Sequence, residues 1–83
     1  MNTESFTASM ERHHLKPSHQ KGNIYRMKTI TKYLTDEQIL SMETRDIVTM
    51  FTEELKVYSW TPSSRDSITS AVNNYKRYLN ETH

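Results

Sequence analysis

The stretch TPSSRDSITSAVNNYKRYL, residues 61–79, decides the fold. Proline disfavours helical geometry in the residue before it and fits well in a first helical turn, so Thr61 is expected in a loop and Pro62 in the first turn of a helix. The apolar residues that follow recur every three or four positions, which is the spacing of one helix face: Ile68, Ala71, Val72, Tyr75 and Leu79. The stretch therefore predicts a C-terminal helix with one core-facing side and an aromatic, basic end.

Residues 35–58 carry two further helix signals. Thr35 with Gln38 three residues later matches a capping box, in which each side chain satisfies the backbone N–H of the other residue. Thr44 is a candidate N-cap for the next helix, and Asp46 suits its first turn. The apolar stripe of this second helix has helical rather than strand spacing: Ile47, Val48, Phe51, Leu55 and Tyr58.

Residues 23–34 predict one more amphipathic helix. Asn23 is its candidate N-cap. Basic side chains, among them Arg26, Lys28 and Lys32, fall outside its apolar stripe. The stripe itself has helical spacing: Ile24, Met27, Ile30 and Leu34.

Residues 1–22 are expected to form a flexible polar tail. They are rich in Ser, Thr, His, Lys and Gln and end at the only glycine. Few apolar side chains are present to offset the entropy of ordering them. Phe6, Met10 and Leu15 have roughly helical spacing, which allows a short helix that Pro17 would end.

These patterns predict an all-α class, a small bundle of about four helices in a single domain over residues 23–83. The chain of 83 residues has no cysteine, which excludes disulfides and thiolate metal sites and fits a cytoplasmic location. No apolar run approaches the ~20 residues needed to cross a bilayer. The net charge of +1 implies no partner, but charge runs basic, acidic, basic along the chain.

No constellation of catalytic or metal-binding residues is recognisable. His13, His14 and His19 lack a regular ligand spacing, so neither a metal nor another cofactor is expected. Two of the carboxylates of residues 36–46 suit helix first turns, and the serines of residues 63–67 suit cap and first-turn positions, with no histidine near them. The chain is expected not to be an enzyme.

Four segments, in their order, form a familiar pattern: Tyr25-Arg26-Met27-Lys28 leading to Tyr33-Leu34, then Met42-Glu43-Thr44-Arg45-Asp46-Ile47, then Trp60-Thr61-Pro62-Ser63-Ser64-Arg65-Asp66-Ser67-Ile68-Thr69-Ser70-Ala71-Val72, then Tyr75-Lys76-Arg77-Tyr78-Leu79. The pattern resembles the N-terminal core-binding domain of tyrosine recombinases, the phage integrases, over about residues 22–80. The resemblance implies a SAM-like helical bundle that binds duplex DNA in a phage or mobile-element setting. The recombinase's catalytic half does not follow, so binding without strand cleavage is expected.

The resemblance also implies which residues would contact DNA. Basic side chains and a helix N-terminus would meet phosphates, which fixes position more than sequence. The matching residues are Lys28 and Lys32 on the first helix and, on the last, Ser63, Ser64, Arg65, Lys76 and Arg77.

The alternative is a small regulator that binds a protein partner through the acidic central helix. Met42, Met50 and Trp60 would supply adaptable or anchoring contacts beside the acidic residues. A homodimer is also compatible with the small size, because a dimer interface would bury apolar area that the monomer lacks.

Overall fold

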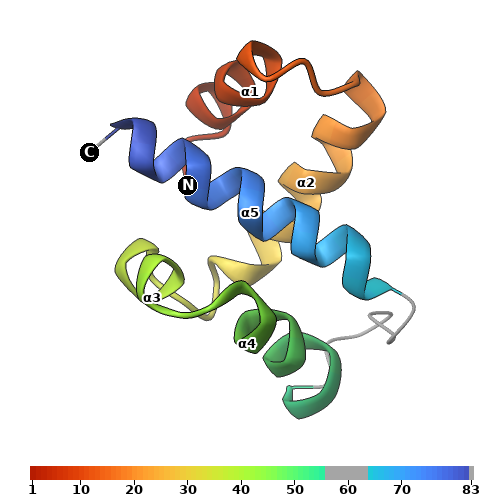
Figure 1. The fold of residues 1–83 in the computed structure, drawn as a ribbon, viewed down its shortest axis with the longest axis vertical. Helices are drawn as coiled ribbons and strands as arrows, with labels where there is room; N and C mark the ends of the chain where they lie inside the picture. Colours follow the sequence, from red (N-terminus) through yellow and green to blue (C-terminus); the bar gives the residue numbers. More distant parts are fainter. Residues whose placement is uncertain (56–63, 83) are drawn as a thin grey trace.

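The computed structural model describes residues 1–55 and 64–82, and the described part is all-α. Its longest helix, α5, crosses the middle of the molecule, with α1 and α2 on one side and α3 and α4 on the other (Figure 1). Each of these four helices contacts α5. The elements, in order, are α1 (Thr3–Arg12), α2 (Pro17–Ile30), α3 (Asp36–Ser41), α4 (Thr44–Thr49), the π-helical turn η1 (Met50–Glu54) and α5 (Arg65–Thr82). The predicted small all-α bundle is confirmed.

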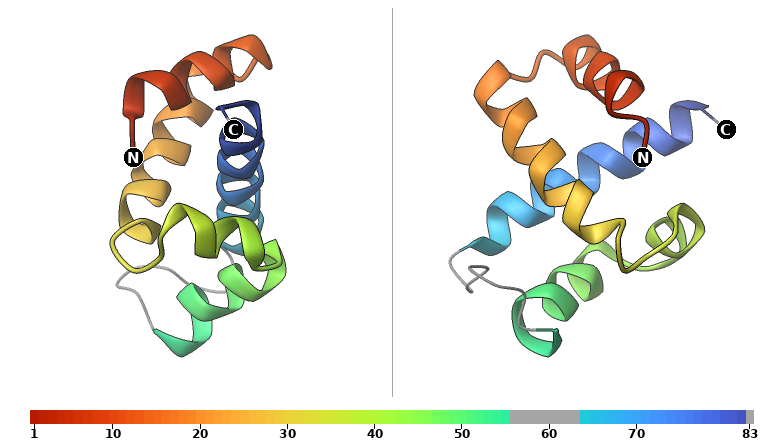
Figure 2. Two further views of the ribbon diagram at one scale, coloured as in Figure 1. Left: turned by 90° about the vertical axis from the view of Figure 1, so that its left-hand side faces the viewer. Right: turned by 180° about the vertical axis from the view of Figure 1, so that it is seen from behind.

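The predicted apolar stripe of the C-terminal helix is the centre of the core. All five of its residues on α5 are buried. Figure 2 shows α2 crossing α5 on one side and α4 lying near the N-terminal half of α5, and both helices contact α5. Burying an apolar side chain stabilises the fold by about 1.5–3 kcal/mol, so this one helix contributes much of the driving force for folding.

The N-terminal segment is part of the bundle, and the predicted tail is wrong. Asn2 caps α1, and its side-chain oxygen accepts a hydrogen bond from the backbone N–H of Ser5 at 3.0 Å. Phe6 and Met10 are fully buried. The Phe6 ring lies edge-on against the ring of Tyr75, with centroids 5.2 Å apart. The helical spacing of Phe6 and Met10 was the correct signal, although Leu15 lies beyond the end of α1. The polar composition around them was misleading.

The boundary expected between residues 22 and 23 falls inside α2. This helix begins at Pro17, where a proline fits because the first helical position needs no N–H donor. Asn23 is therefore not an N-cap. It is buried in the middle of α2, where its amide nitrogen donates to the backbone oxygen of His19.

The middle of the chain combines one confirmed cap with one shifted cap. Both hydrogen bonds of the Thr35–Gln38 capping box are present. The N-cap of α4 is Glu43 rather than Thr44, whose hydroxyl instead donates to the side-chain oxygen of Asn73 on α5 at 2.7 Å.

The helix predicted to continue to Leu55 widens into η1, which changes the angular spacing of its side chains. Phe51 remains in the core as predicted, whereas Leu55 is 42% exposed. Tyr58, the last residue of the predicted apolar stripe, lies outside the described residues. No helix in the described ranges is long and apolar enough to span a membrane.

Candidate nucleic-acid interface

One side of α2 carries a row of exposed basic and aromatic residues, which we call the α2 basic face: Lys21, Tyr25, Lys28 and Lys32. Their spacing of four, three and four positions places them above one another on a helix. Lys32 lies in the turn just after α2. Thr31, which lies between the last residue of α2 and Lys32, keeps right-handed helical dihedral angles, so the row continues past the end of the helix. Tyr25, in the middle of the row, is 59% exposed.

The α2 basic face has no counter-charge of its own. The sequence holds no acidic residue between Glu11 and Asp36. Among residues 1–55 and 64–82, no carboxylate forms an ion pair with Lys21, Lys28 or Lys32. Unpaired cations in a row create a positive field that attracts anionic partners.

The basic residues of α5 make hydrogen bonds within the protein, and two of them join α5 to other elements. The Arg65 guanidinium donates to the hydroxyls of Thr49 and Thr52, each at 3.2 Å, and so ties the start of α5 to α4 and η1. Lys76 donates to the backbone oxygen of Met42, and Arg77 donates to the side-chain oxygen of Asn74 at 2.9 Å.

The structure therefore divides the seven residues predicted to contact DNA. Lys28 and Lys32 lie on one exposed row, while the three cations of α5 make internal hydrogen bonds. Ser64 is partly buried just before α5, and Ser63 lies outside the described residues. The residues that join Lys28 and Lys32 on the row, Lys21 and Tyr25, were not predicted. The i, i+4, i+7, i+11 spacing would have revealed them if the helix had been started at Pro17.

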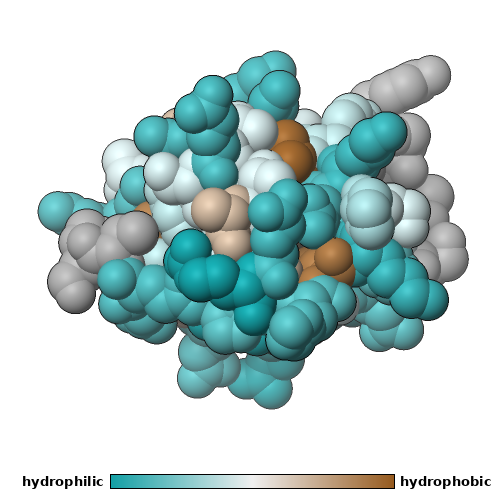
Figure 3. Space-filling view, turned by 90° about the horizontal axis from the view of Figure 1, so that it is seen from above, coloured by the Kyte–Doolittle hydropathy of each residue, from teal (hydrophilic) through white to brown (hydrophobic). Residues whose placement is uncertain are grey.

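The surface expected for a protein partner is only partly available, because its carboxylates are exposed whereas its methionines are not. Met42 and Met50 are partly buried against the core, and Trp60 lies outside the described residues. The Asp36 carboxylate accepts a hydrogen bond from the Tyr75 hydroxyl at 2.8 Å. Figure 3 looks from above onto the α1 and α2 side, not onto α3 and α4, and the hydrophobic residues of that face form only small separate spots among hydrophilic ones. Interaction sites for protein partners usually show a broader apolar patch.

A polar cluster joins the C-terminal end of α1 to the last turn of α5. The Glu81 carboxylate accepts hydrogen bonds from Ser9 at 3.0 Å and from Arg12 at 2.7 Å, and it contacts His13 Nε2. These contacts, with His13 first and Arg12 next, lower the pKa of Glu81 to about 2. Ser9 and His13 both meet the carboxylate rather than each other, so the cluster is not arranged to activate the serine as a nucleophile.

Replacing Glu81 by glutamine should destabilise the protein at neutral pH. A lowered carboxyl pKa means that folding favours the ionised form. The stabilisation from ionised Glu81 is complete above pH 4.5, the ordinary pKa of a glutamate, and is lost as the pH falls to about 2. Urea unfolding of both proteins over this range should show their difference in unfolding free energy shrinking with acid. Glu11→Gln, at an exposed α1 position, is the control, and an equal loss in the two variants would contradict a role for the cluster.

The described residues contain no group of three or more His, Asp and Glu side chains able to hold a metal ion. Comparisons with protein-family models, with curated proteins and with solved structures found no match to this chain. Its function is therefore inferred from its own surface, and the α2 basic face is the feature of that surface with the clearest chemistry.

Proposed function

We propose that this chain binds duplex DNA without cutting it, and that the α2 basic face makes the contact. The observation that carries the proposal is the row of Lys21, Lys28 and Lys32, exposed and without an acidic partner in the described part of the chain. DNA presents one negative charge per ~1.7 Å of helix axis, so a row of free lysines matches it. Of the residues that the integrase resemblance implied, this proposal keeps Lys28 and Lys32 and leaves out those of α5 and its start.

The length of the row suits a phosphate backbone. Positions 21 to 32 span about 16 Å at the ~1.5 Å rise of an α-helix, which covers several successive phosphates. The lysines would displace condensed counterions, which is the main source of affinity for such contacts. Tyr25 would add a hydroxyl that donates to a phosphate oxygen between the charge of Lys21 and the pair of charges of Lys28 and Lys32.

Such contacts fix the protein on the duplex but carry little sequence information. We therefore propose a positioning or architectural role, in line with the phage or mobile-element setting that the integrase resemblance implies. A cytoplasmic location, where such DNA is handled, belongs to the same proposal.

Fluorescence anisotropy with a labelled duplex, repeated over a range of salt concentrations, tests the proposal. We expect binding at about 50 mM salt that weakens steeply as salt rises. The double variant Lys28→Gln/Lys32→Gln should bind about tenfold or more weakly, and its log–log salt slope should be shallower by about 1.8, since each lysine releases ~0.9 counterion.

Arg45→Gln is the matched control for the loss of charge. Arg45 is exposed on α4 and pairs with Glu43 at 3.3 Å, away from the row. This variant should keep the wild-type slope to within about 0.3, well below the ~0.9 of one lost contact. No binding by the wild-type protein at low salt, or equal losses in control and lysine variants, would refute the assignment. A protein partner would then become the better candidate.

A further inference from the structure

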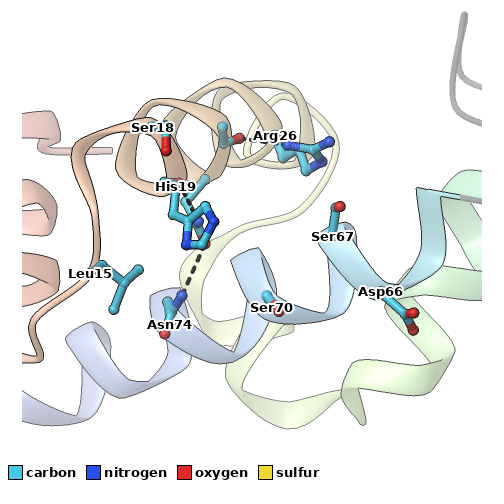
Figure 4. A pocket seen from close by; sticks show the side chains of 10 residues that line it. Leu15, Ser18, His19, Arg26, Asp66, Ser67, Ser70 and Asn74 are labelled. Atoms are coloured by element: carbon cyan, nitrogen blue, oxygen red, sulfur yellow. Dashed lines mark hydrogen bonds between the residues drawn. The ribbon is translucent and has the colours of Figure 1, made fainter.

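A polar groove lies between α2 and the N-terminal half of α5, with a volume of about 420 Å³ (Figure 4). This is within the range of small-molecule sites, toward its lower end. Its lining comes from both helices and from the end of the α1–α2 connection: Leu15, Ser18, His19, Gly22, Asn23, Arg26, Asp66, Ser67, Ser70 and Asn74.

Arg26 supplies a fixed positive charge at the α2 side of this groove. Its guanidinium folds back over its own helix and donates to the backbone oxygen of Gly22 at 3.2 Å. Glycine makes this approach available, because a Cβ at position 22 would lie only 3.0 Å from the same guanidinium nitrogen. Within residues 1–55 and 64–82, Arg26 has no carboxylate partner. The remaining guanidinium N–H groups are therefore available to an anion.

Hydroxyl groups stand across the groove from Arg26. Figure 4 shows Ser67 on the facing wall of α5, with its hydroxyl directed toward the α2 side, and Ser70 one turn further along. Neither hydroxyl has a hydrogen-bond partner within the described ranges. The one carboxylate of the lining, Asp66, sits at the rim and points away from the centre of the groove in this view.

The opposite end of the groove is less polar. The His19 ring projects into the space between the helices, and Leu15 closes the end beside it. Below them, Asn74 donates to the side-chain oxygen of Asn23 at 3.1 Å, and Asn23 in turn is bonded to the His19 backbone. This internal network joins the two helices and makes the floor of the groove a fixed surface.

We infer that this groove binds one nucleoside monophosphate unit. The phosphate would lie between Arg26 and the Ser67 hydroxyl, since guanidinium groups bind phosphate oxygens through two parallel hydrogen bonds. The base would stack on the His19 ring beside Leu15, as aromatic side chains stack on bases in single-strand recognition.

The inference stands apart from the proposed DNA contact, because Arg26 and the groove occupy a different side of α2 from Lys28 and Lys32. Two ligands present this nucleoside monophosphate unit with the same chemistry: a free nucleotide, and an unpaired nucleotide at the end of a bound strand. Either source presents a phosphate and an unstacked base to the same residues.

Amide chemical-shift mapping by ¹H–¹⁵N NMR, with adenosine 5′-monophosphate as the probe, tests the inference. We expect saturable shifts confined to residues 15–26 and 66–74, and much smaller shifts with adenosine or inorganic phosphate alone. Arg26→Gln should weaken binding by about tenfold or more, since a charge-assisted pair is lost. Ser67→Ala should weaken it about threefold, for one neutral hydrogen bond. Arg45→Gln, which removes an equal charge on α4, should leave it unchanged.

The outcomes separate this inference from the proposed function. No groove shifts at about 10 mM nucleotide, or equal weakening by Arg26→Gln and Arg45→Gln, overturns the groove site whether or not duplex DNA binds. Groove shifts without any duplex binding support the site and refute the DNA proposal. Shifts with a duplex that carries a one-nucleotide overhang, absent with a blunt duplex, identify the strand end as the source. Shifts with the free nucleotide alone identify the free ligand.

Discussion

A protein with alanine in place of Phe6 is expected to lose about 3–5 kcal/mol of unfolding free energy, the usual cost of truncating a buried aromatic ring. Phe6 is fully buried, and its ring contacts the rings of Tyr75 at 5.2 Å and Tyr78 at 5.6 Å between centroids. Removing it leaves a cavity where α1 meets α5. Small domains are stable by only about 5–15 kcal/mol, so a large part of the population could unfold at 37 °C. Urea unfolding followed by circular dichroism measures the loss.

Glu11→Ala is the control on the same helix. Glu11 is exposed, and alanine is a good helix former, so its effect should stay within about 0.5 kcal/mol. If Phe6→Ala cost no more than this control, α1 would contribute nothing to the core, and residues 1–22 would behave as the tail that the composition suggested. The comparison therefore decides whether the domain begins near residue 2 or near residue 23.

The first helix shows why composition alone failed at the N-terminus. Averaged over residues 1–22, the chain is polar, and such averages predict disorder. Stability depends instead on where the few apolar side chains go. Phe6 and Met10, four positions apart, both enter the core beside Tyr75 and Tyr78 of α5, and this long-range contact is invisible in a local average.

Signals confined to one element predicted the structure well. The Thr35–Gln38 capping box and the α5 stripe depend only on neighbours within a turn or on one helical period, and both are present. Thr44 shows the limit of this approach. A free threonine hydroxyl would cap a helix, but packing of α4 on α5 brings Asn73 within 2.7 Å, and the hydroxyl bonds there instead.

The candidate site shows the same difference between local sequence signals and tertiary contacts. The integrase resemblance implied Lys28 and Lys32 as DNA contacts, and the helical pattern itself showed only that they fall off the apolar stripe of their helix. Whether a cation is free or internally bonded depends on distant residues, and α5 shows this for Arg65, whose guanidinium reaches hydroxyls 13 and 16 positions away in sequence. Predicting which way a basic side chain points thus required the tertiary structure, whereas predicting that it lies on a helix did not.

Replacing Tyr75 by alanine is the second change with a large expected cost, again about 3–5 kcal/mol. Tyr75 is 1% exposed and lies where three helices meet. Its ring packs against Phe6 of α1, and its hydroxyl donates to the Asp36 carboxylate at the start of α3, 2.8 Å away. Losing the ring removes the contact that joins both sides of α5. Thermal and urea unfolding should both show a much less stable protein, or one that no longer folds.

Tyr75→Phe separates the ring from the hydroxyl. This variant should fold and lose only about 1 kcal/mol, because Asp36 is exposed enough to be hydrated in place of the lost bond.

The Tyr75 hydroxyl also predicts how stability depends on alkaline pH. Burial, the hydrogen bond to Asp36 and the negative charge of Asp36 all raise the pKa of Tyr75 well above its usual range. A raised tyrosine pKa means that folding favours the neutral form, so wild-type stability should fall as the pH rises above about 10, where tyrosine in the unfolded chain ionises. Tyr75→Phe lacks the ionisable group and should show a flatter decline. Equal losses of stability at alkaline pH in the two proteins would show that another group causes the pH dependence. A Tyr75→Phe protein as unstable as Tyr75→Ala would show that the Asp36 hydrogen bond, rather than ring packing, is the main contribution of Tyr75.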